Sequence, residues 1–284
     1  MNIIKLWVAP LIIATLLVLF FRYFLFDFIV VPDDLMNNGL KKGDLILIQK
    51  RTRIKRNNII LIDTTLSSYT NTGRLIRCVA IPGDTILIRN SNIFINKRKL
   101  NQKTLRKGKT LSHYIINSDS NKLKQVLIEN NIPYNQKLAF FGVYHFNTDK
   151  ENILKISKLN LAKSIKGSVT QKGLFSSKTE PFNKLFYWNK DNFGMLVIPA
   201  MGMTIKLNRA NFELYKSIIE YETGQNHIIK GNIVHSGNDI VYNYTFKSDY
   251  YFALNDNRLS TDDSRSFGFI RKDQIFGKFI LKIF

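Results

Sequence analysis

The densest group of side chains that could take part in chemistry lies near the end of the chain, in the segment Asn255–Arg265, which reads NDNRLSTDDSR. Asn and Asp side chains hydrogen-bond to nearby backbone groups and tolerate tight bends. Arginines beside carboxylates form charge-assisted hydrogen bonds that can lock such a bend. A structured surface loop with no reactive group has the same composition, so the order of the residues must decide between the two interpretations.

The other reactive side chains form no catalytic or metal-binding pattern. Asp33 and Asp34 are adjacent, and on a strand they would point to opposite faces, which makes them a poor aspartic pair. Cys78, the one cysteine, lies in an apolar run and is predicted to be a core residue without a disulfide partner in the chain. No Gly-rich phosphate loop is present, and four histidines lack the spacing of metal ligands: His113, His145, His227 and His235. We therefore expect no metal ion and no other cofactor.

The order of residues in this segment resembles the last sequence box of type I signal peptidases, Gly-Asp-Asn-Arg-x-x-Ser-x-Asp-Ser-Arg-x-x-Gly-Phe. In this chain Asn255 replaces the first Gly, and Thr261 replaces the first Ser. A motif of this length rarely agrees by chance. The residues that match it are Asp256, Asn257, Arg258, Asp263, Ser264, Arg265, Gly268 and Phe269.

Two earlier stretches fit the same family in the right order. Its members carry Pro-Ser-x-Ser-Met and then Gly-Asp after an N-terminal anchor, and later Lys-Arg-x-x-Gly-x-Pro-Gly-Asp. Ala80 stands at the first Gly of the later box. Trp188–Pro199 and Tyr244–Leu254 resemble the enlarged Bacteroidetes-type branch, so the resemblance covers both ends of the chain but not its Lys-rich middle. The residues that match the two earlier stretches are Pro32, Met36, Gly43, Asp44, Arg77, Pro82, Gly83 and Asp84.

The reactive positions that the resemblance implies are all replaced. Leu35 stands at the position of the nucleophilic Ser, and Ile76 stands at the position of the Lys base. A hydroxyl becomes a nucleophile only beside a base, and a lysine acts as that base only where its pKa is lowered. Asp33 stands where the family has a Ser or Thr that helps to hold the oxyanion, and a carboxylate there would repel the developing charge.

A shifted alignment does not restore the missing pair. No serine precedes Ser67, and no lysine lies between Lys55 and Lys97. What the resemblance leaves is a supporting shell around the reactive positions, which would hold the turn with or without chemistry. We expect this shell to consist of Arg77, Asp256, Asn257, Arg258, Thr261, Asp263, Ser264 and Arg265.

The resemblance implies a membrane-bound signal peptidase I, a serine endopeptidase that removes signal peptides from exported preproteins. It also implies a single-pass protein of the bacterial inner (cytoplasmic) membrane, with the main domain on the outer, periplasmic side. Because the Ser–Lys dyad is absent, the chain is expected to be degenerate, and whether it is an enzyme is left open. One alternative is an inactive pseudo-peptidase that binds signal peptides or a membrane partner. A decaying gene product without a selected activity is another.

An apolar segment, Leu6–Phe26, precedes these landmarks. The hydrocarbon core of a bilayer needs about 20 helical residues, and Arg22 lies near the end of the segment, where it can snorkel. A buried helix of a soluble domain is an alternative, but the segment is apolar all round. A cleavable signal peptide is another, but no small-x-small site follows. We expect an uncleaved anchor in the lipid bilayer.

Short apolar runs between turns predict a mainly β fold. The resemblance implies that this fold is a signal-peptidase-like β core, which we expect to carry an N-terminal transmembrane helix and an α/β insertion. Helices are predicted at Asp119–Asn130, Lys150–Ala162 and Asn211–Tyr221. The predicted strands are Leu45–Ile48, Ile59–Ile62, Leu75–Ile81, Thr85–Arg89, Ile93–Asn96, Thr204–Leu207, Ile233–His235, Ile240–Lys247 and Tyr250–Leu254.

Composition sets the expected domain limits. Residues 1–27 are the anchor, 28–96 the first part of the core, 97–187 a Lys/Asn-rich insertion with its own small fold or partial disorder, and 188–284 the remainder with the last box. The formal net charge is +21, but the basic residues are spread along the chain instead of clustering with aromatic residues. Such a spread is typical of a base-composition bias in a reduced genome. As a partner for this charge, an anionic lipid surface is expected before nucleic acid.

Overall fold

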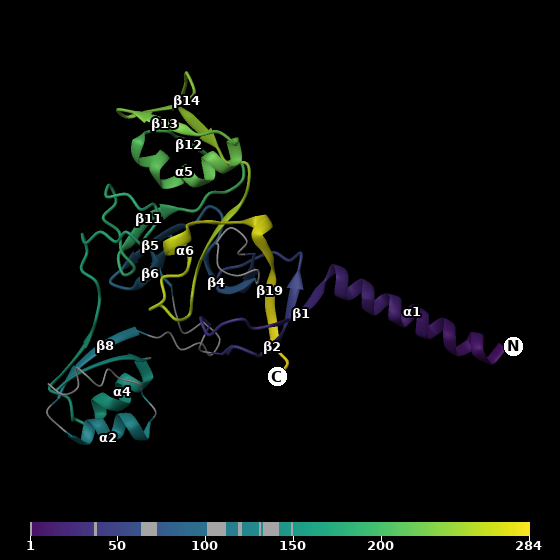
Figure 1. The fold of residues 1–284 in the computed structure, drawn as a ribbon, viewed down its shortest axis with the longest axis horizontal. Coiled ribbons are helices and arrows are strands. Elements are labelled where there is room, and N and C mark those ends of the chain that lie inside the picture. Colours follow the sequence, from purple (N-terminus) through teal and green to yellow (C-terminus); the bar gives the residue numbers. More distant parts are fainter. Residues whose placement is uncertain are drawn as a thin grey trace.

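The first element, α1 (Asn2–Phe24), extends away from the rest of the molecule (Figure 1). A computed structural model of the chain describes residues 2–36, 39–63, 73–100, 112–118, 121–130, 132, 142–148 and 150–284. Within α1, Trp7–Phe24 has a mean hydropathy of 2.0, and none of it is buried against the protein. The helix is therefore long and apolar enough to cross a membrane, as predicted. It ends before Phe26 because that residue starts the first strand.

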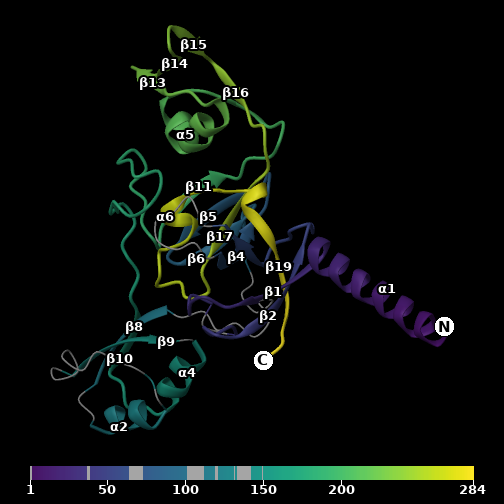
Figure 2. The same cartoon turned by 45° about the vertical axis from the view of Figure 1, so that its right-hand side comes forward.

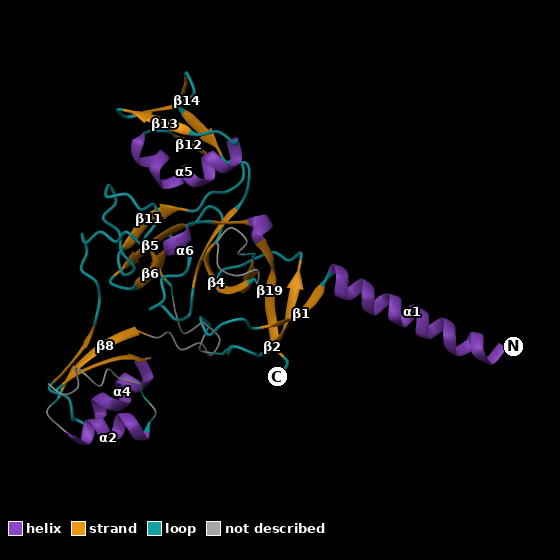
Figure 3. Cartoon of the chain, viewed as in Figure 1, coloured by secondary structure: helices purple, strands orange, loops and turns teal. Residues whose placement is uncertain are grey.

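The main sheet has seven strands in the order β1-β2-β19-β3-β4-β17-β18. Figure 3 labels β1, β2, β4 and β19 of this sheet. The last long strand of the chain, β19, lies between β2 and β3 and pairs with both in antiparallel register. A Cβ atom at Gly277 of β19 would lie 2.5 Å from the Gln49 carbonyl oxygen, so this close approach requires glycine. The strands are β1 (Phe26–Val30), β2 (Leu45–Lys50), β3 (Ile59–Ile62), β4 (Arg74–Ala80), β17 (Tyr250–Leu254), β18 (Ile270–Arg271) and β19 (Ile275–Lys282).

A second sheet has the order β11-β5-β6-β7. Its hairpin turns at Asn90 and Ser91, whose φ angles are 49° and 62°, and Arg89 faces Asn92 in the register. The gap of three residues between the predicted strands Thr85–Arg89 and Ile93–Asn96 is therefore one residue too long, because left-handed backbone at two positions suits a tight two-residue hairpin. The strands are β5 (Thr85–Arg89), β6 (Asn92–Ile95), β7 (Arg98–Lys99) and β11 (Phe193–Val197).

In the Lys-rich middle of the chain, the described residues form a separate three-stranded sheet, β10-β8-β9, together with helices α2 and α4. It lies apart from the two larger sheets in both Figure 1 and Figure 2. Ile116, Leu123, Phe146 and Ile156 are buried together in its core. The elements are β8 (Ser112–Asn117), α2 (Asn121–Glu129), β9 (Val143–Thr148), α4 (Lys150–Lys158) and β10 (Ser164–Gly167). Both predicted helices form in shorter versions; Asp119 and Ser120 lie outside the described residues.

A third group of elements surrounds α5 (Arg209–Thr223). The side chain of Asn208 accepts a hydrogen bond from the Asn211 backbone N–H, and Gly224 ends the helix with a φ of 67°. The single strand predicted at Ile240–Lys247 is wrong, because its first half pairs with β14 and its second half with β12. The strands are β12 (Thr204–Lys206), β13 (His227–Lys230), β14 (Ile233–Ser236), β15 (Asp239–Val241) and β16 (Asn243–Thr245).

Candidate functional site

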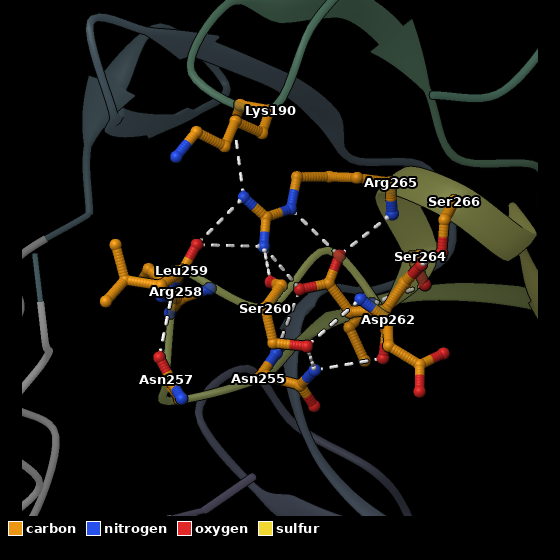
Figure 4. A network of polar contacts seen from close by, with 12 residues as sticks. Lys190, Asn255, Asn257, Arg258, Leu259, Ser260, Asp262, Ser264, Arg265 and Ser266 are labelled. Atoms are coloured by element: carbon orange, nitrogen blue, oxygen red, sulfur yellow. Dashed lines mark hydrogen bonds and ion pairs between the residues drawn. The ribbon is translucent and has the colours of Figure 1, made fainter. Parts of the chain in front are cut away.

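The last box follows β17 and is built around the ion pair of Asp263 and Arg265. Figure 4 shows the Arg265 side chain, which points toward Lys190 and Ser260. Asp263 caps the short helix α6 (Ser264–Phe267) by accepting the Arg265 backbone N–H. The Arg265 guanidinium donates to both carboxylate oxygens of Asp263, at 2.9 and 2.7 Å, and also to the carbonyls of Lys190 and Ser260. The Asp263 side chain is fully buried, and Arg265 is nearly so. The charge-assisted hydrogen bonds expected between an arginine and an acid of this turn are therefore present, between Arg265 and Asp263.

A second buried ion pair joins the box to the main sheet. Arg77 of β4 donates to Asp256 through Nε at 2.7 Å and Nη2 at 2.5 Å, and its Nη1 donates to the Asn57 carbonyl at 2.9 Å. The two residues meet because β17 pairs with β4, which puts Leu254 opposite Arg77. Arg74, two residues earlier on β4, forms a more exposed pair with Asp262 at 2.7 Å. The box is thus fixed to β4 at two places.

Arg258 differs from the other arginines of the box. Its Nε, Nη1 and Nη2 atoms are buried, and none has a hydrogen-bond partner among the described residues. Burial lowers the pKa of the guanidinium to about 10, an effect that the nearby Asp256 carboxylate opposes. Asp263 therefore pairs with Arg265 and not with Arg258. The backbone carbonyl of Arg258 accepts hydrogen bonds from the Arg265 guanidinium.

Leu35 lies directly against the box. Its backbone carbonyl accepts a hydrogen bond from the Asn257 N–H at 3.1 Å, and its own N–H donates to Asp33 Oδ1 at 2.9 Å. β1 ends at Val30, so Asp33 and Asp34 lie in a loop and not on a strand as predicted. The two carboxylates accept hydrogen bonds from different backbone groups: Asp33 from the Leu35 N–H, and Asp34 from the Lys42 N–H.

Ile76 is fully buried in β4, opposite Ile60 of β3. It packs in an apolar cluster that includes Cys78 and Ala253, so Cys78 is a core residue as predicted. Ala253 belongs to β17, the strand that leads into the box. The segment from β17 to Asn257 therefore connects the surroundings of Ile76 with those of Leu35.

The hydroxyl groups of Ser264 and Thr261 lie in different surroundings within the box. The Ser264 Oγ is buried and accepts the Ala253 N–H at 3.0 Å, which fixes α6 to β17. The Thr261 side chain is half-buried, and its hydroxyl has no hydrogen-bond partner in the described part of the chain. Among the described residues no three His, Cys, Asp or Glu side chains gather as metal ligands. His113 and His145 pair across β8 and β9 at 3.1 Å, away from the box.

Three groups that hold the supporting shell lie outside the box, and the sequence did not predict them. The Lys190 carbonyl, the Asn57 carbonyl and Arg74 all hold it in place. One signal was available: Arg77 lies in an apolar strand, and a buried arginine needs a carboxylate partner. The acids of the box were the obvious candidates for that partner.

A family model for signal peptidase, peptidase S26, matches residues 4–143 and 208–284. The chain belongs to the signal peptidase family. Both the box and β4 lie within the matched residues, so the two ion pairs lie in the family part of the chain. The unmatched stretch, 144–207, contains α4, β10 and β11.

Curated signal peptidases of Bacillus are similar to this chain. Signal peptidase I P of Bacillus subtilis subsp. natto is 30% identical over 116 residues, which cover 39% of this chain and 60% of the relative. Signal peptidase I of Bacillus licheniformis is 31% identical over 100 residues, 34% of this chain and 52% of the relative. Signal peptidase I T of Bacillus subtilis strain 168 is 30% identical over 107 residues, which cover 36% of this chain and 54% of the relative. The chain thus spans a little over half the length of the curated relatives it matches.

Proposed function

We propose that this chain acts on the signal peptides of exported preproteins as a degenerate signal peptidase, which binds these segments without cleaving them through a serine–lysine pair. The observation that carries the proposal is the contrast between the box and its surroundings. The ion pairs Arg77–Asp256 and Asp263–Arg265 are in place. The two positions that the family uses for nucleophile and base hold Leu35 and Ile76.

Hydrolysis of a peptide bond needs a nucleophile, a base and a place for the oxyanion within reach of one another. Leu35 has no side-chain heteroatom, and Ile76 has no group that can take up a proton. Asp33 lies beside Leu35, since its Oδ1 accepts the Leu35 N–H at 2.9 Å. A carboxylate at this place opposes the negative charge that develops on the scissile carbonyl oxygen. The chemistry therefore fails at all three positions.

Binding of an apolar segment does not need these groups. The Leu35 backbone is held by the hydrogen bond from Asn257, and Met36 is buried with Leu75 in one apolar cluster. Leu35, which is half-buried, puts an alkyl side chain in place of a hydroxyl and makes the surface of the site more apolar, which suits the apolar core of a signal peptide. Ile76 is fully buried, so it removes the amine without adding surface. The supporting ion pairs then serve to keep the shape of a binding site.

We propose an inner-membrane location with a single pass and the main domain on the periplasmic side. α1 supports the anchor, because its side chains from Trp7 to Tyr23 are exposed in the protein and apolar apart from Thr15, Arg22 and the hydroxyl group of Tyr23. A signal peptide that is still in the bilayer would meet a site tethered to the same membrane. The proposed substrate and the proposed anchor are therefore consistent with each other, because both lie at the same membrane.

A preprotein cleavage assay tests the proposal. The full-length protein, purified in detergent, is incubated with a preprotein that carries a signal peptide, and the products are read by mass spectrometry. We expect intact preprotein and a complex that survives gel filtration. Leu35→Ser alone or Ile76→Lys alone should also leave the preprotein intact, since the effects of catalytic groups that act together are strongly non-additive.

The triple change Asp33→Ser, Leu35→Ser and Ile76→Lys supplies all three groups in the same binding site, and we expect it to cleave weakly. Robust cleavage by the unmodified protein, persisting in Thr261→Val, would overturn the proposal that the site does not cleave signal peptides. Failure to form a complex would overturn the proposal of binding. The two parts are thus tested separately.

A further inference from the structure

A cavity of about 170 Å³ lies between α5, β11 and the box. Trp188, Phe193, Leu196 and Phe269 contribute apolar walls, and Glu180 contributes a carboxyl group. Neither Leu35 nor Ile76 is among the described residues that line it. Sites for drug-sized molecules measure roughly 300–1,000 Å³, so this cavity has room for about one side chain. Figure 2 shows α5 on one side of this region and β11 with α6 on the other.

Glu180 is held firmly at the edge of the box. Its backbone N–H donates to the Arg265 carbonyl at 2.8 Å. A Cβ atom at Gly268 would lie 3.8 Å from Glu180 Oε1, so the carboxyl group lies against that glycine. In the described part of the chain the carboxyl group has neither a hydrogen-bond donor nor a cation as a partner. Burial raises its pKa to about 7.

The rest of the cavity does not neutralise this carboxyl group. α5 contributes Glu213, Lys216 and Glu220 to the lining. Lys216 pairs with Glu220 at 4.0 Å, which leaves Glu213 as a second acid without an ion-pair partner among the described residues. The chain as a whole carries a net charge of +21, so an acidic cavity is a local exception.

We propose that this cavity binds the side chain of a lysine or arginine in a peptide partner. The cationic end would meet Glu180, and the alkyl stem would lie along Trp188 and Phe193, whose ring centroids are 4.5 Å apart. Long basic side chains bury their stems on apolar surfaces, and their charge is attracted both to carboxylates and to aromatic faces.

A purely structural role does not explain Glu180. An acid without a partner in an apolar cavity destabilises the folded state, and a glutamine of the same shape would avoid the charge. Groups that weaken a fold are retained where function needs them. The inference is independent of the proposed function, because it concerns a cavity separate from Leu35 and holds whether or not signal peptides are bound there.

The chain offers a built-in reporter for the test, because Trp188 is one of only two tryptophans. In a Trp7→Phe background, in detergent, Trp188 fluorescence is measured during titration with acetyl-Ala-Lys-Ala-amide and its arginine counterpart. The control peptide carries norleucine, which keeps the apolar stem but lacks the charge. We expect saturable changes with the two cationic peptides and none with norleucine. Glu180→Gln should weaken the binding about tenfold, the effect of one charge-assisted hydrogen bond.

Asp239→Asn is the matched control, since Asp239 is exposed on β15. Removing its carboxylate changes the net charge by the same amount as Glu180→Gln. It should leave the affinity unchanged. An equal response to norleucine would show a merely apolar cavity and overturn the inference. Unchanged affinity in Glu180→Gln would do the same. A response to spermidine but to neither cationic peptide would show that the ligand is a free polyamine and contradict the assignment to a peptide.

Discussion

Arg77 and Asp256 are joined by two hydrogen bonds across 179 positions of sequence, between Nε and Oδ1 at 2.7 Å and between Nη2 and Oδ2 at 2.5 Å. Both side chains are almost fully buried, at 6% and 5% exposure. The pair fixes the turn after β17 to the strand that carries Ile76. Together with the more exposed Arg74–Asp262 pair, this buried pair therefore helps to set the position of the box relative to Ile76 and Leu35.

Asp256→Ala should destabilise the protein by roughly 3–5 kcal/mol, because it leaves Arg77 charged and buried without its partner. The free energy of unfolding can be measured by chemical denaturation followed by circular dichroism. Asp262→Ala is the control, since its carboxylate is 56% exposed and its pair with Arg74 should contribute less than about 1 kcal/mol. Equal losses in the two variants would contradict the role assigned to the buried pair.

The sequence predicted those parts of the fold that short-range patterns determine. Ile59–Ile62 and Tyr250–Leu254 form strands with the predicted limits, because apolar runs between turns indicate buried strands. α5 was recognisable from its apolar face and from Gly224 at its end. The order of the strands was not predictable in this way. β19 lies between β2 and β3 through pairing that spans most of the chain, and no local pattern records it.

The candidate site was predicted as a set of residues but not as a geometry. Asp263 and Arg265 are close in sequence, and their pairing follows from the turn. The contact of Asn257 with Leu35 depends on how two distant loops meet, and the sequence alone does not give it. Glu180 was missed for a different reason: its Lys-rich surroundings resemble a solvated loop, and only the folded chain brings its carboxyl group against Gly268.

Asp263→Ala should destabilise the protein by roughly 3–5 kcal/mol, because it removes the cap of α6 and leaves the Arg265 guanidinium buried without a carboxylate. Asp263→Asn keeps an acceptor for the backbone N–H groups and should lose less. Thermal unfolding of the two variants measures the difference. Asp273→Ala, which removes the exposed partner of Arg271, is the control and should lie within about 1 kcal/mol of the unmodified protein. An unchanged melting temperature for Asp263→Ala would show that the turn does not need the pair.

α1 should anchor the protein in membranes. Its apolar stretch Trp7–Phe24 has the length of a membrane-spanning helix. Carbonate extraction of membranes from expressing cells should therefore leave the full-length protein in the pellet. A variant that lacks residues 2–24 should move to the soluble fraction. Release of the unmodified protein by carbonate would contradict a spanning helix.

Glu180→Gln should stabilise the protein above pH 7 and have no effect near pH 4.5. The folded-state pKa of Glu180 is raised from 4.5 to about 7, so between these values the folded state binds more protons than the unfolded state. The free energy of unfolding must then fall as the pH rises through this window. Since the side chain is half-buried, we expect the variant to gain about 1–2 kcal/mol at pH 8.

Melting temperatures of the two proteins across pH 4.5–8 test this expectation. Glu213, Lys216 and Glu220 also line the cavity and titrate in both proteins, so the difference between the proteins isolates Glu180. A constant difference across the range would contradict a raised pKa. A lower melting temperature for Glu180→Gln at pH 8 would show that the carboxylate stabilises the fold.

The measurement that tests the central claim most directly is site-specific photo-crosslinking at position 35. A photoreactive amino acid replaces Leu35 in the full-length protein, and Asp239 is replaced in the control. Each protein is irradiated with a preprotein in membranes, and the adduct is sized and sequenced. The account predicts an adduct from position 35 that contains the uncut preprotein, with crosslinking through its signal peptide, and none from position 239. Adducts that contain only a cleaved signal peptide, or no adduct from position 35, would contradict it.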